Sequence, residues 1–375
     1  MKIKPFKVEQ WMNEYENDAV YNIAETCVYS ITLNELMDLT GVNREQFWEK
    51  LSDQRLTYGH IQGSPDFKKG VAALYKTLKE ENILSTHGAI GANHLLLYSL
   101  VEPGDRVISV LPTYQQLYSI PESFGADLKI LKLREENEYL PDLEELRSLV
   151  NSNTKIININ NPNNPTGALM PTDMLMKIVE IARSVDAYIL CDEVYRGLSQ
   201  NEEYQESIAD LYEKGISVSS MSKIFSLAGL RMGWIASPSR EVMEKSSQHR
   251  DYNMISCGIF DEAFSALALK HAEIILGKSR EIVRRNLEIL DRWVEDQPRI
   301  SYVKPKAGTT ALLSYDFDIP SRDFCISLLK EKGVFLTPGS CFEMEKCVRI
   351  GYAASTKELK EGLGKMGEFL ETLSD

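Results

Sequence analysis

Short apolar runs alternate with longer stretches of helical spacing over most of the chain, from about residue 66 onward. Four of the runs are rich in isoleucine, valine or leucine and end in polar residues or proline: "RVISVLP", "KIININNP", "AYILCDE" and "GISVSSMSK", at 106–112, 155–162, 187–193 and 215–223. Such runs predict strands buried on both faces of a parallel sheet. Between them, "DFKKGVAALYKTLKEEN" (66–82) and "NHLLLYSLVEPGD" (93–105) have the spacing of helices. This alternation predicts an α/β fold with right-handed crossovers.

The C-terminal third has a different pattern. "EIILGKSREIVRRNLEILDRWVED" (273–296) predicts one long amphipathic helix, and the runs that follow it predict a mixture of strands and helices. The first 40 or so residues are too few for a domain and are expected to pack on this C-terminal unit. We therefore expect a large domain at 46–270 and a small α+β domain formed by 1–45 together with 271–375.

Composition narrows the classes of partner. The chain has 375 residues, and 42 basic against 55 acidic side chains give a formal net charge of −13, which would repel a nucleic-acid backbone. The longest apolar runs, such as "LLLYSLV" (95–101), are too short to span a bilayer, and the first residues lack the apolar region of a signal peptide. We expect a cytoplasmic protein that binds neither nucleic acid nor membrane.

Cysteines and histidines indicate no metal site. The six cysteines show no C-x-x-C spacing and the five histidines no H-E-x-x-H motif. The cysteines are expected to be reduced thiols.

The chemistry-bearing residues follow the predicted strands, where ligands bind in open α/β sheets. "HGAIGAN" after "ILST" is a turn of small residues that opens a helix, and its free N–H groups can meet a phosphate. "NPNNPTG" (161–167) is a tight turn with amide donors, Asp192 and Tyr195 follow "AYIL", and Lys223 follows "GISVSSM". Together these residues suit a ligand that has a phosphate, a ring nitrogen that pairs with an anion, and an electrophilic carbon. Pyridoxal phosphate has all three.

These motifs also carry a family resemblance. "SMSKIFSLAGLRMGW" (220–234) resembles the lysine motif S-x-S-K-x-x-x-x-x-G-x-R-x-G of the class I/II aminotransferases, which are fold type I pyridoxal-phosphate enzymes. "NPNNPTG", "DEVY", the "GAIGA" turn, "PTY" and "RIGYA" occur in that family's order, and the resemblance covers nearly the whole chain from about Tyr58 onward. It implies a large domain with a mostly parallel central sheet covered by helices, plus the smaller α+β domain.

The resemblance assigns a role to each matching residue. Lys223 is similar to the lysine that forms the internal aldimine and shuttles the proton, and Asp192 to the partner of the pyridinium nitrogen. Tyr195 and Asn164 resemble donors to the ring hydroxyl oxygen, and Tyr114 resembles the aromatic residue stacked on the ring. The residues that resemble the phosphate cup are Gly88, Ala89, Ile90, Ser220 and Arg231.

Two further correspondences concern the substrate and a second subunit. Arg349 resembles the fork that grips the substrate α-carboxylate, near Asn164, and Tyr58 resembles the tyrosine that reaches the phosphate of a neighbouring subunit. A homodimer with shared sites is therefore expected.

One departure concerns the N-terminal segment, where a glycine near the substrate is usual and this chain reads "NIAETCVYSITL" (22–33). Glu25 could therefore face the substrate side-chain pocket, which would suit a cationic or polar amino acid.

Each residue also has a simpler reading. A lysine is usually a surface group, and Asp192 and Glu193 could cap a helix, a reading that suits Glu193 better. Tyr114 and Tyr58 could be ordinary half-buried tyrosines, and Arg349 could belong to a surface ion pair.

The expected activity is pyridoxal-phosphate-dependent transfer of an amino group from an L-amino acid to a 2-oxo acid by a ping-pong mechanism. Alternatives on the same scaffold are a carbon–sulfur β-lyase and an amino-acid oxidase or cyclase. An amine-sensing transcription regulator is disfavoured, because the residues before the first motif leave no room for a helix-turn-helix domain and the net charge is negative.

Overall fold

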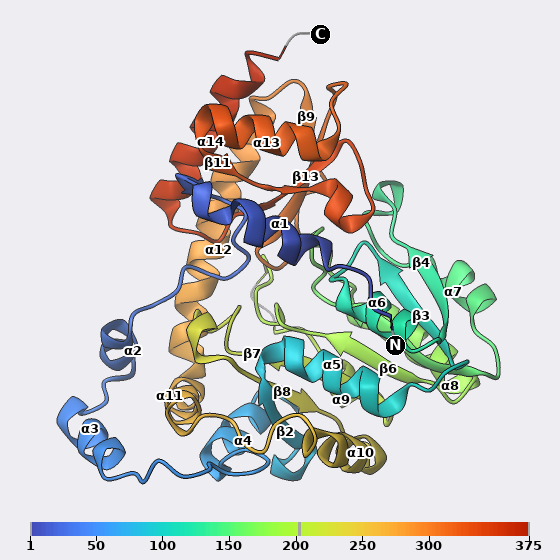
Figure 1. Cartoon of the computed structure of the whole chain (residues 1–375), viewed down its shortest axis with the longest axis vertical. Coiled ribbons are helices and arrows are strands. Elements are labelled where there is room, and N and C mark those ends of the chain that lie inside the picture. Colours follow the sequence, from blue (N-terminus) through green and yellow to red (C-terminus); the bar gives the residue numbers. More distant parts are fainter. Residues whose placement is uncertain (1, 202–203, 374–375) are drawn as a thin grey trace.

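A seven-stranded sheet forms the centre of the larger part of the molecule (Figure 1). The computed structural model describes residues 2–201 and 204–373. The strands lie in the order β2 (Ile83–His87), β8 (Met232–Ala236), β7 (Gly215–Ser220), β6 (Tyr188–Asp192), β5 (Thr154–Asn160), β3 (Arg106–Leu111) and β4 (Asp127–Lys132). Pairing is parallel except at β8, which runs antiparallel to β2 and β7. The sheet is therefore mostly parallel, as the apolar runs predict.

Helices cover both faces of this sheet. Successive side chains of a strand point to opposite faces, so strands that are apolar along their length need cover on both sides. Ile156 and Leu190 pack in one apolar cluster and their neighbours Ile157 and Ile189 in the other. The first cluster is completed by α5 (Gly88–Leu100), α6 (Gln116–Ser123) and α10 (Arg240–Arg250). The second is completed by α7 (Leu143–Leu149), α8 (Thr172–Ser184) and α9 (Ile208–Leu211).

The small domain is built around short sheets near the C-terminus. Its four-stranded sheet has the order β12 (Thr337–Pro338), β13 (Cys347–Gly351), β10 (Thr310–Tyr315) and β9 (Ile300–Ser301), and β11 (Val334–Phe335) pairs in parallel with β1 (Tyr21–Asn22). Helices α13 (Ser321–Lys332) and α14 (Thr356–Leu370) pack against these strands. The long helix α12 (Ala272–Glu295) runs from the region of α11 (Ile259–Lys270) up to the small domain (Figure 1).

The N-terminal residues lie against the C-terminal ones. Helix α1 (Lys7–Tyr15) is fastened there because the Trp11 Nε1 donates a hydrogen bond to the Leu336 carbonyl oxygen at 2.8 Å. Farther along, α2 (Leu33–Thr40) contacts α11 and α12, and α3 (Arg44–Ser52) follows it at the edge of the molecule (Figure 1).

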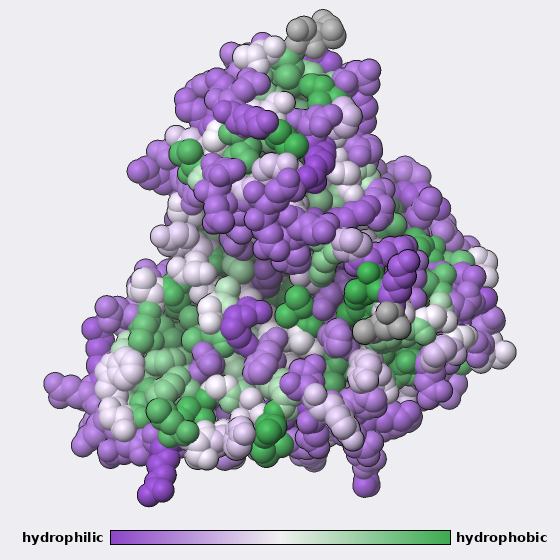
Figure 2. All heavy atoms as spheres, viewed as in Figure 1, coloured by the Kyte–Doolittle hydropathy of each residue, from purple (hydrophilic) through white to green (hydrophobic). Residues whose placement is uncertain are grey.

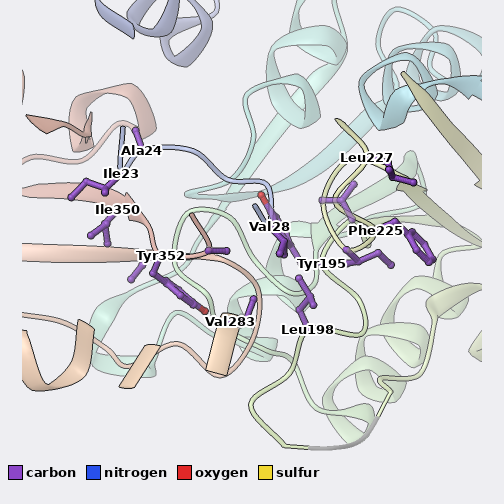
Figure 3. Packing of buried hydrophobic residues seen from close by; sticks show 14 of the residues in the cluster. Ile23, Ala24, Val28, Tyr195, Leu198, Phe225, Leu227, Val283, Ile350 and Tyr352 are labelled. Carbon is purple, nitrogen blue, oxygen red and sulfur yellow. The ribbon is translucent and has the colours of Figure 1, made fainter. Parts of the chain in front are cut away.

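Residues 23–31, which we name the crossing segment, connect the small domain to the loop that carries Lys223. The Gly351 N–H donates to the Ile23 carbonyl oxygen at 2.8 Å, and the Ile31 N–H donates to the Ser226 carbonyl oxygen at 3.2 Å. A Cβ on Gly351 would lie 1.8 Å from the backbone oxygen of Glu25, so this approach requires glycine. Figure 3 follows the segment from Ile23 and Ala24 to Val28, among buried residues that include Tyr195 and Phe225.

One predicted helix is shorter than its apolar spacing indicates. In the stretch 66–82, α4 (Pro65–Ala72) covers only the first part. The N–H groups of Lys76 and Thr77 donate to the Asp210 Oδ1 at 3.0 and 2.8 Å. Because these N–H groups bond a side chain from α9, they cannot continue the helix.

Across the described ranges, no helix is long and apolar enough to cross a membrane.

Candidate active site

The predicted site residues meet at one edge of the large sheet, where the parallel strands have their carboxyl ends. Gly88 follows β2, Asp192 ends β6, and Lys223 lies three residues beyond β7. Arg231 directly precedes β8, whose antiparallel direction brings its beginning to the same edge. Residues that are far apart in the sequence are thus brought to one edge by the strand pairing alone.

Asp192 is a buried carboxylate, 4% exposed, with no ion-pair partner within the described part of the chain. Its Oδ2 accepts a hydrogen bond from the Asn93 Nδ2 at 2.9 Å, and its Oδ1 accepts one from the Val194 N–H at 3.2 Å. Burial raises the pKa of Asp192, while the two hydrogen bonds and the charge of Lys223 favour the ionised form. A cation placed against this carboxylate would relieve the cost of its burial.

Several buried polar atoms of predicted site residues, or of residues next to them, have no hydrogen-bond partner among the described residues. They are the Tyr195 Oη, the Asn93 Oδ1, the Thr113 Oγ1 and the Arg349 Nε. Unpartnered buried polar atoms cost free energy, so several at one sheet edge indicate a place for a polar ligand.

The beginning of α5 forms a cradle for an anion. Gly88 has a φ of +68°, and a Cβ there would lie 3.1 Å from the Arg231 Nη2. Gly233 of β8 packs so closely on this turn that a Cβ would lie 2.4 Å from the Gly88 carbonyl carbon. Ala89 and Ile90 complete the helix start, whose free N–H groups favour a phosphate.

Ser220 and Arg231 differ in exposure. Ser220 is buried and its Oγ accepts a hydrogen bond from the Ser222 N–H at 3.3 Å. Arg231 is exposed and its Nη1 donates to the Ala228 carbonyl oxygen at 2.9 Å. Its Nη2 is the atom nearest the Gly88 turn.

Lys223 is partly buried and is held by the crossing segment. Its Nζ donates a hydrogen bond to the Thr26 Oγ1 at 2.6 Å and to the Cys27 Sγ at 3.3 Å. Burial would lower the pKa of Lys223, but Cys27, Tyr195 and Glu25 outweigh burial and raise it. Lys223 is therefore an ammonium group until something removes its proton.

Arg349 is 2% exposed, so it is not a surface ion pair. Its Nη1 donates to the Asn164 Oδ1 at 3.3 Å, and its Nη2 donates to the Thr337 Oγ1 at 3.0 Å and to the Ala24 carbonyl oxygen at 3.3 Å. Burial lowers the pKa of Arg349. A buried guanidinium held by neutral acceptors is suited to bind a carboxylate.

The two aromatic candidates lie in different environments. Tyr114 is partly buried, its ring centroid lies 4.8 Å from that of Phe6, and its hydroxyl donates to the Glu9 Oε1 at 2.8 Å. Burial and the nearby Glu9 carboxylate raise the pKa of Tyr114. Tyr58 is 71% exposed on a loop, away from any contact that would tie it to this site.

Glu193 lies below the site and belongs to the core. Its Oε2 pairs with the Arg196 Nε at 3.0 Å, and both side chains are at most 5% exposed. Its Oε1 accepts from the Ile208 N–H at 2.9 Å, at the beginning of α9. Glu193 therefore does stabilise a helix N-terminus, although the helix begins 15 residues farther along the chain.

Sequence reasoning missed four residues that contact the site: Glu9, Thr26, Cys27 and Asn93. Asn93 lies five residues after Gly88, on the face of α5 that turns toward Asp192. The sequence could have indicated Asn93, because it is a polar residue near the beginning of the predicted helix in "GANHLLLYSL". The three N-terminal residues had no such signal, because the place of Glu9 depends on the packing of α1 and that of Thr26 and Cys27 on the path of the crossing segment.

Pyridoxal phosphate fits this arrangement. Asp192 supplies an anion for the ring nitrogen, the unpartnered Tyr195 Oη a donor for the ring hydroxyl oxygen, and the Gly88 turn with Arg231 a cradle for the phosphate. The fold and this site define a fold type I enzyme that uses pyridoxal phosphate.

The sequence profile described as "Aminotransferase class I and II" matches residues 34–365, and the chain belongs to this family of pyridoxal-phosphate-dependent aminotransferases. A solved pyridoxal-phosphate-dependent aminotransferase from Streptococcus suis is 49% identical with a TM-score of 0.97 and full coverage of both chains. Capreomycidine synthase from Streptomyces vinaceus is 27% identical over 97% of this chain and 93% of its own length. An aspartate aminotransferase from Pyrococcus horikoshii is 29% identical over 92% of this chain and 91% of its own length.

Proposed function

We propose that the protein moves an amino group from an L-amino acid to a 2-oxo acid in two half-reactions of a ping-pong mechanism. The observation that carries the proposal is Asp192, a buried carboxylate without an ion-pair partner among the described residues. It lies at the sheet edge that also holds Lys223, and Arg349 of β13 donates a hydrogen bond to Asn164, which follows β5 at this edge. When bound, the cofactor supplies an aldehyde that condenses with amines and a protonated ring that withdraws electrons from the substrate Cα.

The protein's own residues then bind and orient the reactants. Asp192 keeps the ring nitrogen protonated, with Asn93 holding its carboxylate in place. The Tyr195 hydroxyl and the Asn164 amide donate to the ring oxygen, and Tyr114 covers the ring. The phosphate is bound by Gly88, Ala89, Ile90, Ser220 and Arg231.

Lys223 and Arg349 act on the substrate. Arg349 binds the α-carboxylate with its guanidinium fork, and Asn164 fixes the plane of that fork through the Nη1 hydrogen bond. Lys223 would be the amine that bonds the cofactor in the resting enzyme. Once the substrate amine had displaced it, its free Nζ would accept the proton from the substrate Cα and donate it to the cofactor carbon.

We propose that the protein works as a homodimer in the cytoplasm. We also propose that residues 46–270 form the large domain and that 1–45 and 271–375 form the small domain. Several loop residues carry exposed apolar side chains, among them Leu56, Tyr58 and Tyr252 at 81%, 71% and 94% exposure. Figure 2 shows apolar side chains on the lower half of the molecule, around the place that α4, α5 and α11 take in Figure 1. A second copy seated there would bring its Tyr58 to the exposed Arg231 and Gly88 cradle.

Borohydride trapping tests the assignment of Lys223. Borohydride should fix the cofactor to the wild-type chain and to the surface variant Lys245→Ala, and peptide mapping should find it on Lys223. Lys223→Ala should bind the cofactor without trapping it, and covalent cofactor on that variant would contradict the proposal.

A second candidate is a different reaction at the substrate carbons, which the similarity to a protein named as a synthase favours. Transamination predicts aminated cofactor after mixing with an amino acid alone, and turnover that depends on a 2-oxo acid. A β-lyase would release ammonia and pyruvate from a sulfur-containing amino acid without any 2-oxo acid, and an oxidase would consume oxygen.

A further inference from the structure

Glu25 lies between the two cations that handle the substrate in the proposed function. The residue before it, Ala24, accepts a hydrogen bond from Arg349, and the two residues after it, Thr26 and Cys27, accept from Lys223. The Glu25 backbone is fixed there by its tight approach to Gly351. Its carboxylate is close enough to both cations that Lys223 lowers the pKa of Glu25 and Glu25 raises that of Arg349, against the larger effect of burial in each case.

The Glu25 carboxylate is ionised. Burial raises the pKa of Glu25, but the charge of Lys223 and the N–H groups of Cys27 and Thr26 outweigh burial and hold it below its ordinary value. Its Oε1 accepts both N–H groups, at 2.7 Å from Thr26 and 2.8 Å from Cys27. Within the described residues, no ion pair to Glu25 is present at salt-bridge distance.

Lys223 balances this charge only while its amine is free and protonated. In the holoenzyme Lys223 would bond the cofactor, so the partly buried Glu25 carboxylate would no longer face a free ammonium group. Glu9 adds a second carboxylate from α1, at the hydroxyl of Tyr114. Arg349 is committed to the α-carboxylate and Arg231 to the phosphate, so the substrate itself can supply the missing cation.

We infer that Glu25 determines specificity and that the amino donor carries a cationic side chain, a guanidinium or an ammonium group, which pairs with the Glu25 carboxylate. This inference rests on the proposed function for the place of the substrate. A charge-assisted hydrogen bond in such a site should favour a cationic over a neutral side chain of equal length by about tenfold to a hundredfold. A second carboxylate, as in aspartate, should be disfavoured by repulsion from Glu25.

Binding of unreactive acids tests the inference without turnover. Calorimetry on the holoenzyme compares 5-guanidinopentanoate, hexanoate and pentanedioate, all of which offer a carboxylate to Arg349 and lack an amine. Wild type should bind the guanidinium acid about tenfold or more tightly than hexanoate, and pentanedioate most weakly. The variant Glu25→Gln keeps the acceptor for the Thr26 and Cys27 N–H groups and should remove most of the guanidinium preference, leaving hexanoate binding within about threefold.

The control Glu102→Gln, an exposed carboxylate in a turn beyond α5, should keep the wild-type order. Equal weakening of all three acids in Glu25→Gln, or wild-type preference for hexanoate or pentanedioate, would overturn the inference.

The half-reaction separates this inference from the proposed function. Arginine, lysine and ornithine should convert the cofactor faster than norleucine or aspartate in wild type, and Glu25→Gln should lower this ratio. Conversion by no amino acid would contradict the proposed function alone, because the calorimetric order does not depend on turnover. Preferred conversion of aspartate or norleucine would contradict the role of Glu25 alone.

Discussion

The buried ion pair between Glu193 and Arg196 allows a quantitative prediction. Both side chains are nearly inaccessible, at 2% and 5% exposure, and join at 3.0 Å. The Arg196 guanidinium also lies 4.5 Å from the ring centroid of Tyr75 and 4.7 Å from that of Tyr204. Replacing Arg196 by methionine keeps much of the volume and leaves Glu193 as an uncompensated buried charge. Removing one partner of such a pair costs about 3 to 5 kcal/mol of unfolding free energy.

That loss predicts a fall in melting temperature of about 4 to 6 °C, taking about 2.1 cal/mol/K of unfolding entropy for each residue. Burial already raises the pKa of Glu193 while Arg196 favours its charged form, so the variant should raise this pKa further. A carboxyl whose pKa is higher in the folded than in the unfolded state binds more protons when folded, and stability then increases as the pH falls. The deficit of Arg196→Met should therefore be smaller at about pH 6 than at about pH 8.

Circular dichroism melting of the holoenzyme, at one protein concentration and both pH values, measures these differences. The control Arg240→Met removes an exposed pair between Arg240 and Glu244 and should leave the melting temperature unchanged. The double variant Glu193→Gln with Arg196→Met should recover part of the loss. A deficit below about 1 kcal/mol, or one that is equal at both pH values, would refute the reasoning.

Three further changes test the site. Gly233→Ala should push away the first turn of α5, lower the unfolding free energy by about 1 to 3 kcal/mol and weaken cofactor binding in a fluorescence titration, whereas Gly229→Ala, which has open space around it, should do neither. Asp192→Asn should weaken cofactor binding by about tenfold to a hundredfold in equilibrium dialysis, with the exposed Asp186→Asn as control; unchanged affinity would remove Asp192 from the ring nitrogen. Mixed dimers of Tyr58→Ala and Lys223→Ala chains test whether the sites are shared. If they are, one site of each mixed dimer has both residues intact and activity should rise on mixing; if they are not, activity should stay absent.

The parallel strands and the residues after them could be predicted from the sequence because both depend on local patterns. The stretch 155–162 is rich in isoleucine and ends in polar residues, and its place in a parallel sheet follows from the alternation of strands with helices. Ligands of open α/β sheets bind beyond the carboxyl ends of the strands, so the position of this strand end near the ligand can be predicted without knowing how side chains pack. Gly88, Asp192 and Lys223 were therefore within reach of sequence reasoning.

Contacts made by side chains of distant segments could not be predicted in the same way. The helix beginning at Pro65 does not continue through Lys76 and Thr77, because Asp210, more than a hundred residues later, accepts hydrogen bonds from their N–H groups. Thr26 and Cys27 reach Lys223 only because Gly351 admits the crossing segment. The pattern of apolar and polar residues around Asp210 or Gly351 does not reveal either contact.

Strand β1, directly before the crossing segment, also constrains the order of events during synthesis. Tyr21 and Asn22 leave the ribosome long before their strand partners Val334 and Phe335. At about 5 to 20 residues per second, the two are separated by roughly 15 to 60 s. During that interval the large sheet can form, but the small-domain strands that hold the crossing segment beside Lys223 have not yet been made. The nascent chain is therefore expected to gain the surroundings of Lys223 only after the large sheet has been made and Val334 and Phe335 have emerged.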